Sequence, residues 1–158
     1  MQELTHMDES GRPRMVDVTK KPDTQREAVA RGTVRMQAAT LDLLKKGKVA
    51  KGDVLAVAKL AGIMAAKQTP SLIPLCHPVL IGDVRIDFTL DEKNSTVEIT
   101  TTVDSIGKTG VEMEALTATA VTALTIYDMC KAVDRGIQIE NIRLISKSGG
   151  KSGTITLE

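Results

Sequence analysis

Apolar residues recur at three- and four-residue spacing in three stretches of the chain. This is the period of a helix with one apolar face, and it predicts helices over residues 33–46, 53–67 and 111–135. Gly47 and Gly136 directly follow the first and the third of these stretches, where a glycine commonly ends a helix. The pattern thus predicts three helices, with stretches of a different character between them.

Two other stretches alternate between apolar and polar residues, which is typical of strands with one buried face. They cover residues 84–90 and 97–103 and are joined by the short polar segment 91–95, so they predict an antiparallel hairpin. A last strand is expected over residues 137–146. Three prolines within residues 69–78 predict that this segment is extended or looped, because proline disfavours a regular helix.

The order helix, helix, hairpin, helix, strand predicts an α+β fold in which helices cover one face of an antiparallel sheet. A ferredoxin-like topology is the first expectation. Residues 1–14 are polar and contain Gly11 and Pro13, so we expect a flexible N-terminal arm. Neither a repeat nor a linker divides the remainder, which predicts a single domain over residues 15–158 with a Gly- and Lys-rich C-terminal tail.

Composition argues against several classes of function. With 1% aromatic residues, Phe88 and Tyr127, the chain lacks the platforms on which single-strand nucleic-acid binders stack bases. A net charge of +1 also argues against a binder of duplex DNA. No window approaches the ~20 apolar residues of a membrane span, and the N-terminus lacks the apolar core of a secretion signal. Two cysteines fit a reducing compartment, so we expect a cytoplasmic protein.

Ionisable residues lie at both ends of one stripe on the predicted helix 111–135. Glu114 lies near its start and Asp128 and Lys131 near its end, with apolar residues between them. Asp128 and Lys131 are either a surface ion pair or a general base and a general acid held beside an apolar surface. Glu114 and Asp128 are separated by about 21 Å of helix, so a small ligand cannot easily reach both in one chain. Two copies paired about a two-fold axis would join the ends, which predicts a site shared between subunits.

Glu112 and His77 each have more than one interpretation. Glu112 lies three residues after Thr109, so the two residues form a capping box or Glu112 serves catalysis. His77, between Cys76 and Pro78, is either a buried or hydrogen-bonding loop residue or a group that contacts a ligand or transfers a proton. A metal site needs three or four ligands, and the histidines and cysteines are too few and wrongly spaced for one.

Two glycine- and lysine-containing segments fall short of a nucleotide-binding P-loop. Gly107-Lys108-Thr109 lacks the required upstream glycine and precedes two acids, and Gly150-Lys151-Ser152 leaves too few residues for a following helix. Several lysines nevertheless lie at element ends or in Gly-rich loops, where binding residues concentrate. These lysines are Lys51, Lys67, Lys108, Lys131, Lys147 and Lys151. They predict a polyanionic small molecule as a partner.

Four segments are long and unusual enough to point to a family. They are REAVARG (26–32), KGDVLAVAKLAGIMAAKQTPSLIPLCHP (51–78), TGVEMEALTATAVTALTIYDMCKAVD (109–134) and LISKSGGKSG (144–153). Together they resemble the molybdenum cofactor biosynthesis protein C family, the cyclic pyranopterin monophosphate synthases. The resemblance covers essentially all of residues 15–153, with no departure at the motif positions.

The resemblance implies a lyase reaction in molybdenum cofactor biosynthesis. In it, (8S)-3′,8-cyclo-7,8-dihydroguanosine 5′-triphosphate becomes cyclic pyranopterin monophosphate with release of diphosphate. It also implies a ferredoxin-like fold and a homohexamer, a trimer of dimers with the active site at the dimer interface. No cofactor is expected, apart from a Mg²⁺ ion that could accompany the triphosphate, and no nucleic-acid or membrane partner is expected.

By motif match, Asp128 and Lys131 would be the catalytic acid/base pair, and two further groups of residues would bind the substrate. The pocket would be lined by Leu75, Cys76, His77, Glu112, Met113 and Glu114. Positive charge for the triphosphate would come from Lys51, Lys67, Lys147 and Arg26. Two other classes of function stay open on the sequence: a regulatory ligand-binding module of the same fold and a purely structural oligomer.

Overall fold

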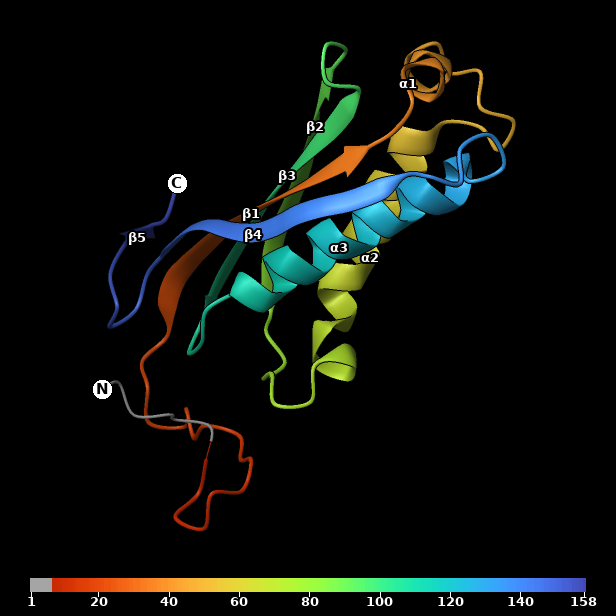
Figure 1. Ribbon diagram of the computed structural model, residues 1–158. Helices are drawn as coiled ribbons and strands as arrows, with labels where there is room; N and C mark the ends of the chain where they lie inside the picture. The colour runs from red at the N-terminus through yellow and green to blue at the C-terminus, as the bar shows by residue number, and fades with distance from the viewer. Residues whose placement is uncertain (1–6) are drawn as a thin grey trace.

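The computed structural model describes residues 7–158, which are built around a five-stranded antiparallel sheet (Figure 1). Its strands are β1 (Thr24–Arg35), β2 (Ile81–Asp91), β3 (Thr96–Gly107), β4 (Gln138–Ser148) and β5 (Ile155–Thr156). In space they follow the order β2-β3-β1-β4-β5. β1 is therefore the central strand, and it pairs along most of its length with β3 on one side and β4 on the other.

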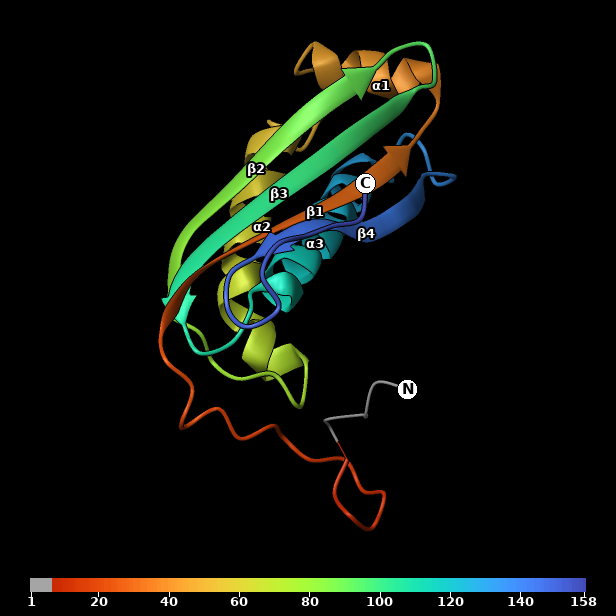
Figure 2. The ribbon, with the colours of Figure 1, turned by 90° about the vertical axis from the view of Figure 1, so that its left-hand side faces the viewer.

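Two long helices cover one face of this sheet (Figure 1 and Figure 2). They are α2 (Val54–Leu72) and α3 (Glu112–Cys130), which pack against each other, while the shorter α1 (Ala38–Lys45) follows the end of β1. The other face of the sheet carries ion pairs, such as Arg85 with Asp104 and Arg143 with Glu158. The expected α+β fold, with ferredoxin-like packing of helices on one face of an antiparallel sheet, is confirmed.

Small side chains fill the layer between the sheet and the helices. β1 contributes Ala28 and Ala30 and α3 contributes Ala115, and all three are fully buried. Gly62 of α2 lies so close to α3 that a Cβ atom at this position would overlap the Thr122 hydroxyl. Because small residues let the backbones approach closely, the domain reaches a dense core with only one Phe and one Tyr.

The predicted helix over residues 33–46 is wrong at its start. Residues 33–35 belong to β1, which was not expected at all, and α1 begins only at Ala38. Val34 satisfies the helical spacing, but it also fits the alternation of β1, where it is fully buried in the core. Hydrogen-bonded neighbours on both sides of β1 decide in favour of the strand.

The three prolines within residues 69–78 predicted a non-helical segment, but Pro70 lies inside a helix. α2 continues to Leu72 with Pro70 inside it, beyond the expected end at Lys67. A proline removes one backbone hydrogen bond from a helix, and α2 continues for only two residues beyond Pro70. The non-helical segment therefore begins at Ile73.

α3 ends at Cys130, earlier than the predicted end at residue 135. The buried carboxylate of Asp134 explains the difference, because it ties the following turn to the start of α1. It accepts hydrogen bonds from the Gln37 N–H at 2.8 Å, the Thr40 hydroxyl at 3.1 Å and the Gly136 N–H at 3.1 Å. Gly136 thus belongs to this turn and does not cap the helix.

The structure describes the whole C-terminal end of the chain but only part of the predicted N-terminal arm. Residues 1–6 of the predicted N-terminal arm lie outside the described residues, and Met7 forms an isolated bridge with Pro13. At the other end, the unexpected strand β5 pairs with Ser146 and Lys147 of β4. Across residues 7–158, none of the helices has the length and apolar character that crossing a bilayer would need.

Candidate active site

A small cavity lies at the N-terminal end of α3. It has a volume of about 160 Å³ and is bounded by the first turn of α3 and by the segment that follows α2. Its lining contains all six residues expected in the substrate pocket, which are Leu75, Cys76, His77, Glu112, Met113 and Glu114. Thr109 and Gly110, which were not expected there, complete it. The fold thus brings together the PLCHP and TGVEMEAL motifs.

Glu114 is the buried acid of this cavity, with 2% of its surface exposed. Burial raises the pKa of its carboxyl, and the negative charge of Glu112 raises it further. The neighbouring Cys76 is affected in the same way, since burial and both glutamates raise the pKa of its thiol. A thiol with a raised pKa is a poor nucleophile, so Cys76 serves this cavity as a wall and Glu114 as its buried acid.

The raised pKa of Glu114 predicts a pH dependence of stability. Its value in the folded chain lies above the ordinary 4.5, so the folded state holds its proton more tightly than the unfolded state. Stability is therefore lost as pH rises from about 4.5 through the raised pKa. We expect the stability of Glu114→Gln, measured relative to the wild type, to be greater at about pH 8 than at about pH 5, because glutamine does not ionise. Urea unfolding at both pH values, at one protein concentration, measures this.

Asp87→Asn is the control for that measurement, because Asp87 is an exposed carboxylate on β2. It should show little change in its stability difference from the wild type between the two pH values. An equal difference for Glu114→Gln at both pH values would contradict the effect assigned to burial.

Glu112 pairs with Lys147 of β4, and both side chains are partly buried. The alternative of a capping box with Thr109 is wrong, because the N-cap position of α3 is Val111 and no side chain caps the helix there. The ammonium group of Lys147 holds the Glu112 carboxylate instead. Lys147, one of the predicted cationic residues, is thereby placed beside the cavity.

His77 connects the cavity to the N-terminal segment. Its Nε2 lies 2.7 Å from the carbonyl oxygen of Val16. A carbonyl only accepts hydrogen bonds, so Nε2 carries the proton and donates it, which leaves Nδ1 as the acceptor in the neutral ring. Val16 was not expected near the site, and nothing in the local sequence pairs two residues so far apart.

A second cluster lies at the other end of α3. The Asp128 carboxylate accepts hydrogen bonds from Lys131 Nζ at 2.6 Å and from Lys51 Nζ at 3.1 Å. Lys51 also donates to the backbone carbonyl of Asp128 at 2.9 Å. These contacts lower the pKa of Asp128, with Lys131 the larger cause, and the carboxylate in turn raises the pKa of Lys131. All three side chains are exposed, so water screens these ion pairs.

The two clusters do not meet within one chain. Glu114 lies in the first turn of α3 and Asp128 in its last turns, and a helix of that length separates them by about 21 Å. Two other predicted cations also lie apart from the small cavity. Lys67 lines a groove of about 550 Å³ between α2 and the start of β2. Arg26 lines a third cavity next to the C-terminal Gly-rich loop.

A metal ion has no evident ligand set in this part of the chain. Among residues 7–158, no three His, Cys, Asp or Glu side chains are grouped so that they could hold one.

Comparison with known proteins decides the family. The sequence model described as the MoaC family matches residues 15–150. This chain belongs to the MoaC family. It is 65% identical over 153 residues to the cyclic pyranopterin monophosphate synthase of Roseiflexus sp. (strain RS-1), covering 97% of each protein. The resemblance expected from the four motifs is confirmed.

Two further relatives of this MoaC-family chain agree. The cyclic pyranopterin monophosphate synthase of Heliobacterium modesticaldum is 63% identical over 153 residues, or 97% of this chain and 96% of that protein. That of Parvibaculum lavamentivorans is 60% identical over 150 residues, or 95% of this chain and 94% of that protein. These relatives are synthases, and this member of the MoaC family is likewise an enzyme.

Proposed function

We propose that this chain is a cyclic pyranopterin monophosphate synthase of molybdenum cofactor biosynthesis. As a lyase it would convert (8S)-3′,8-cyclo-7,8-dihydroguanosine 5′-triphosphate to cyclic pyranopterin monophosphate and release diphosphate. One observation carries the proposal beyond family membership. α3 bears an acidic cavity around Glu114 at one end and the linked charges of Lys51, Asp128 and Lys131 at the other.

The cavity around Glu114 suits the guanine-derived ring of this substrate. The pairing edge of such a ring is rich in N–H donors, and a carboxylate accepts hydrogen bonds from them. Met113 provides an apolar wall beside Glu114, in a site with few aromatic residues to stack on. Hydrogen bonds from the ring would favour the ionised carboxylate and so oppose the effect of burial on its pKa.

The cluster around Asp128 suits the proton transfers of ring opening and closure. The Asp128 carboxylate can accept a proton and the Lys131 ammonium group can donate one, and their ion pair favours these charged forms. Lys51 adds a second positive charge beside the same carboxylate. Cations at this point would stabilise negative charge on a departing diphosphate. We therefore assign Lys131 as the acid and Asp128 as the base.

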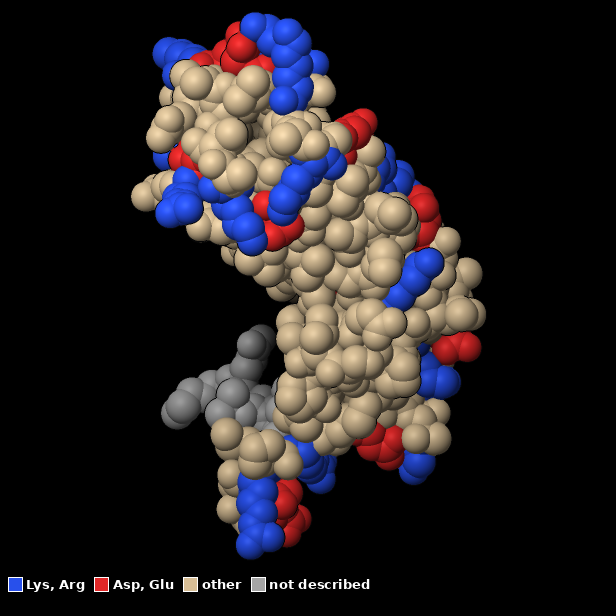
Figure 3. Space-filling view, turned by 90° about the vertical axis from the view of Figure 1, so that its right-hand side faces the viewer, with Lys and Arg blue, Asp and Glu red and all other residues tan. Residues whose placement is uncertain are grey.

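A site shared between subunits would unite the two clusters. The exposed side of α2 carries Val57, Leu60 and Met64 on one face, and Leu124 is exposed on α3. Figure 3 shows the corresponding face of the molecule as a broad surface with few charged side chains. Such a surface is typical of a contact with another protein chain. A two-fold dimer through it would bring Glu114 of one copy toward Asp128 of the other.

The remaining expectations belong to the same proposal. Three such dimers would form the homohexamer, and the enzyme would act in the cytoplasm on a small molecule, without a nucleic-acid or membrane partner. Mg²⁺ would reach the site only with the triphosphate.

Turnover of the cyclised GTP derivative tests the proposed function. We expect the purified chain to produce cyclic pyranopterin monophosphate and diphosphate in equal amounts, measured by chromatography and by a diphosphate assay. Binding of the substrate without diphosphate release would contradict the proposal and favour a regulatory ligand-binding module instead.

Two lysines of the same loop give a matched pair of variants. Lys51→Ala should lower kcat about 100-fold, because it removes a preorganised charge from the reacting groups. Lys48→Ala removes an exposed lysine only three residues away, which lies outside the Asp128 cluster, and should leave kcat unchanged. Equal rates for the two variants would contradict the role given to Lys51.

A further inference from the structure

A buried acid follows the Asp128 cluster (Lys51, Asp128 and Lys131) in the turn after α3. Asp134 comes three residues after Lys131, and 2% of its surface is exposed. The chemistry proposed above uses the three charges of the cluster and gives this acid no role. A carboxylate removed from water is costly unless hydrogen bonds replace its hydration. The partners of Asp134 therefore show which parts of the chain it holds together.

Three donors satisfy the two oxygens of Asp134. The Gln37 N–H and the Thr40 hydroxyl donate to Oδ2 at 2.8 and 3.1 Å, and the Gly136 N–H donates to Oδ1 at 3.1 Å. Thr40 is as deeply buried as Asp134. Hydrogen bonds to a carboxylate are stronger than those between neutral groups, and little water competes for them at a buried position. Asp134 therefore joins the end of α3 to the start of α1.

The carboxylate of Asp134 also replaces a missing cap on α1. The N-cap residue Gln37 makes no capping hydrogen bond with its side chain, and the first turn of α1 contains no acid. The Gln37 N–H is one of the backbone donors that a helix leaves unpaired at its start. A negative charge at this point also interacts favourably with the helix dipole. The start of α1 is therefore tied to the turn after α3.

α1 extends this attachment to Lys51. The helix is eight residues long, and its Leu41 and Leu44 are buried in the core, so it is a short rigid element. Directly after it, the Gly47 N–H donates to the Leu44 carbonyl at 3.1 Å, and Lys51 follows four residues later. Lys51 Nζ donates to the carbonyl and to the carboxylate of Asp128. The position of Lys51 therefore depends on where α1 lies.

The turn after α3 fixes Lys131 from the other side. The Asp134 N–H donates to the Cys130 carbonyl at 3.1 Å, in the same turn that contains Lys131. The contacts form a closed loop, which runs from Asp134 through α1 and Lys51 to Asp128 and back along the end of α3. Figure 1 shows α1, the start of α2 and the segment after α3 together at one end of the molecule.

The ion pairs of the Asp128 cluster do not fix this geometry by themselves. The side chains of Lys51, Asp128 and Lys131 are 46%, 56% and 51% exposed. Water screens such pairs, and they restrain long side chains only weakly. The short distances from both ammonium groups to the carboxylate therefore depend on where the backbone places each residue. The buried contact of Asp134 joins the two backbone segments that carry the lysines.

We propose that Asp134 is a positioning residue, which places Lys51 and Lys131 against Asp128 by tying the start of α1 to the turn after α3. The proposal rests on the proposed function for the reaction in which these groups act. Preorganised charges accelerate a reaction because they need no rearrangement as charge develops, and small displacements lose much of that gain. The Glu114 cavity lies at the other end of α3, so loss of the contact should lower kcat and leave KM nearly unchanged.

Thr40→Val is the test substitution, because it keeps the shape of the side chain and removes its hydroxyl. Asp134→Asn is more severe, since its amide group would face at least one donor and threaten the fold itself. Thr40→Ser restores the hydroxyl and is the conservative variant. Thr119→Val is the matched control. Thr119 is also buried, and its hydroxyl donates to the Thr101 hydroxyl at 2.9 Å from the middle of α3, away from the Asp128 cluster.

Steady-state kinetics with the cyclised GTP derivative give the first measurement. We expect Thr40→Val to lower kcat about tenfold with KM within about twofold of the wild type, because the reacting groups lose their alignment. Thr40→Ser should recover most of the kcat, and Thr119→Val should keep the wild-type value. Rates are compared per folded protein, with the folded fraction taken from circular dichroism. Equal kcat values for Thr40→Val and Thr119→Val would overturn the proposal.

NMR of protein labelled with ¹³C at lysine Cε measures the positioning without turnover. The Asp128 carboxylate is the main cause that raises the pKa of Lys131, and Tyr127 adds to it. In Thr40→Val this pKa should fall toward the ordinary 10.5, because Lys131 is held less closely to Asp128. In Thr119→Val it should stay at the wild-type value. The Lys131 signal is assigned by its absence from Lys131→Arg.

The two measurements separate this proposal from the proposed function. If the wild type converts the cyclised GTP derivative while Thr40→Val keeps the wild-type kcat and the wild-type pKa of Lys131, the proposed function stands and the role of Asp134 is wrong. If the wild type converts no substrate while Thr40→Val lowers the pKa of Lys131 and Thr119→Val does not, the proposed function is wrong and the positioning by Asp134 stands.

Discussion

Two variants that are each nearly inactive, Lys131→Ala and Glu114→Gln, should regain activity when their subunits are mixed. Alone, Lys131→Ala removes the proposed acid and should lower kcat about 100-fold or more. Glu114→Gln replaces an acceptor of two hydrogen bonds by a group with one acceptor and one donor, so it should lose the ring of the substrate. Because the two residues lie at opposite ends of α3, each variant leaves intact the half that the other has lost.

Mixed oligomers selected with two different affinity tags give the measurement. A two-fold axis places both substitutions in one site of a mixed dimer and neither in the other, so up to about half of the wild-type activity should return. Lys131→Ala mixed with Asp128→Asn is the control, because each site of that mixed dimer carries one of the two substitutions and neither site is intact. No recovery in the first mixture would mean that each chain works alone or that the two ends serve different sites.

Gly62→Ala should destabilise the protein although alanine is the better helix former. In the middle of a helix this substitution usually gains about 0.5–1 kcal/mol. Here the new Cβ would overlap the Thr122 hydroxyl and lie 2.5 Å from Ile86 Cδ1. Overpacking of a dense core typically costs about 1–3 kcal/mol, so the net effect is a loss of stability. Thermal unfolding should show a Tm several degrees lower, at about 2–4 °C per kcal/mol for a chain of this size.

The double variant Gly62→Ala/Thr122→Ala separates this collision from other effects. The Thr122 hydroxyl is buried and has no hydrogen-bond partner among residues 7–158, so its removal breaks no bond within them. Truncating it makes room for the new methyl group, and part of the lost Tm should return. A single variant Gly62→Ala with a raised Tm would show that helix propensity outweighs the contact between α2 and α3.

Much of the fold was predictable because its elements carry clear periodicity. The β2–β3 hairpin shows the alternation of a strand pair, and α2 and α3 show helical spacing over most of their length. β1 escaped prediction because its inward positions hold Ala28, Ala30 and Gly32, which are small and have low strand propensity. Its place in the sheet follows from close packing against α3, and a local pattern does not contain that information.

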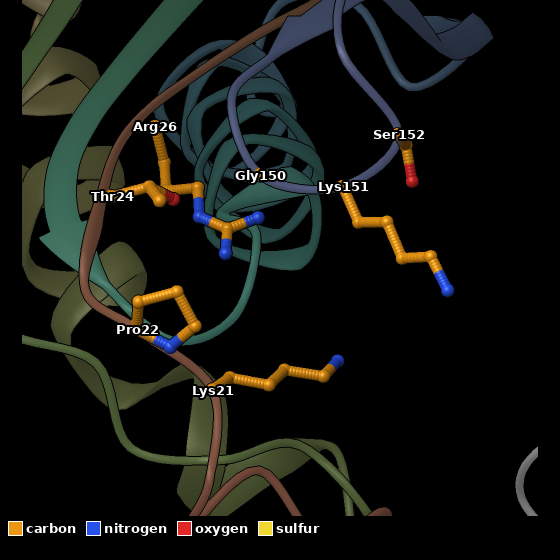
Figure 4. Close-up of a pocket in the computed structure, with 7 residues that line it drawn as sticks. All are labelled: Lys21, Pro22, Thr24, Arg26, Gly150, Lys151 and Ser152. Carbon is orange, nitrogen blue, oxygen red and sulfur yellow. The ribbon is translucent and has the colours of Figure 1, made fainter.

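Only part of the candidate site was predictable from the sequence as well. The residues at each end of α3 were predictable because they follow one another at helical spacing or in unusual motifs. Contacts between distant segments were not predictable by spacing. The hydrogen bond from His77 to Val16 spans 61 residues and the ion pair of Lys147 with Glu112 spans 35. The sequence around one partner contains nothing that indicates the other. The cavity lined by Arg26 likewise needs the start of β1 and the loop after β4 side by side (Figure 4).

The central position of β1 also sets the order of events while the chain is being made. β1 ends at Arg35, but β4, its neighbour on one side, starts only at Gln138. At about 5–20 residues per second, a ribosome needs roughly 5–20 s to add the intervening chain. β3, its neighbour on the other side, is complete only at Gly107, so β1 has two bare edges at first and one bare edge until β4 is made. A bare edge is the part of a sheet most prone to join another chain. The newly made protein therefore depends on β4 pairing with β1 before such an encounter.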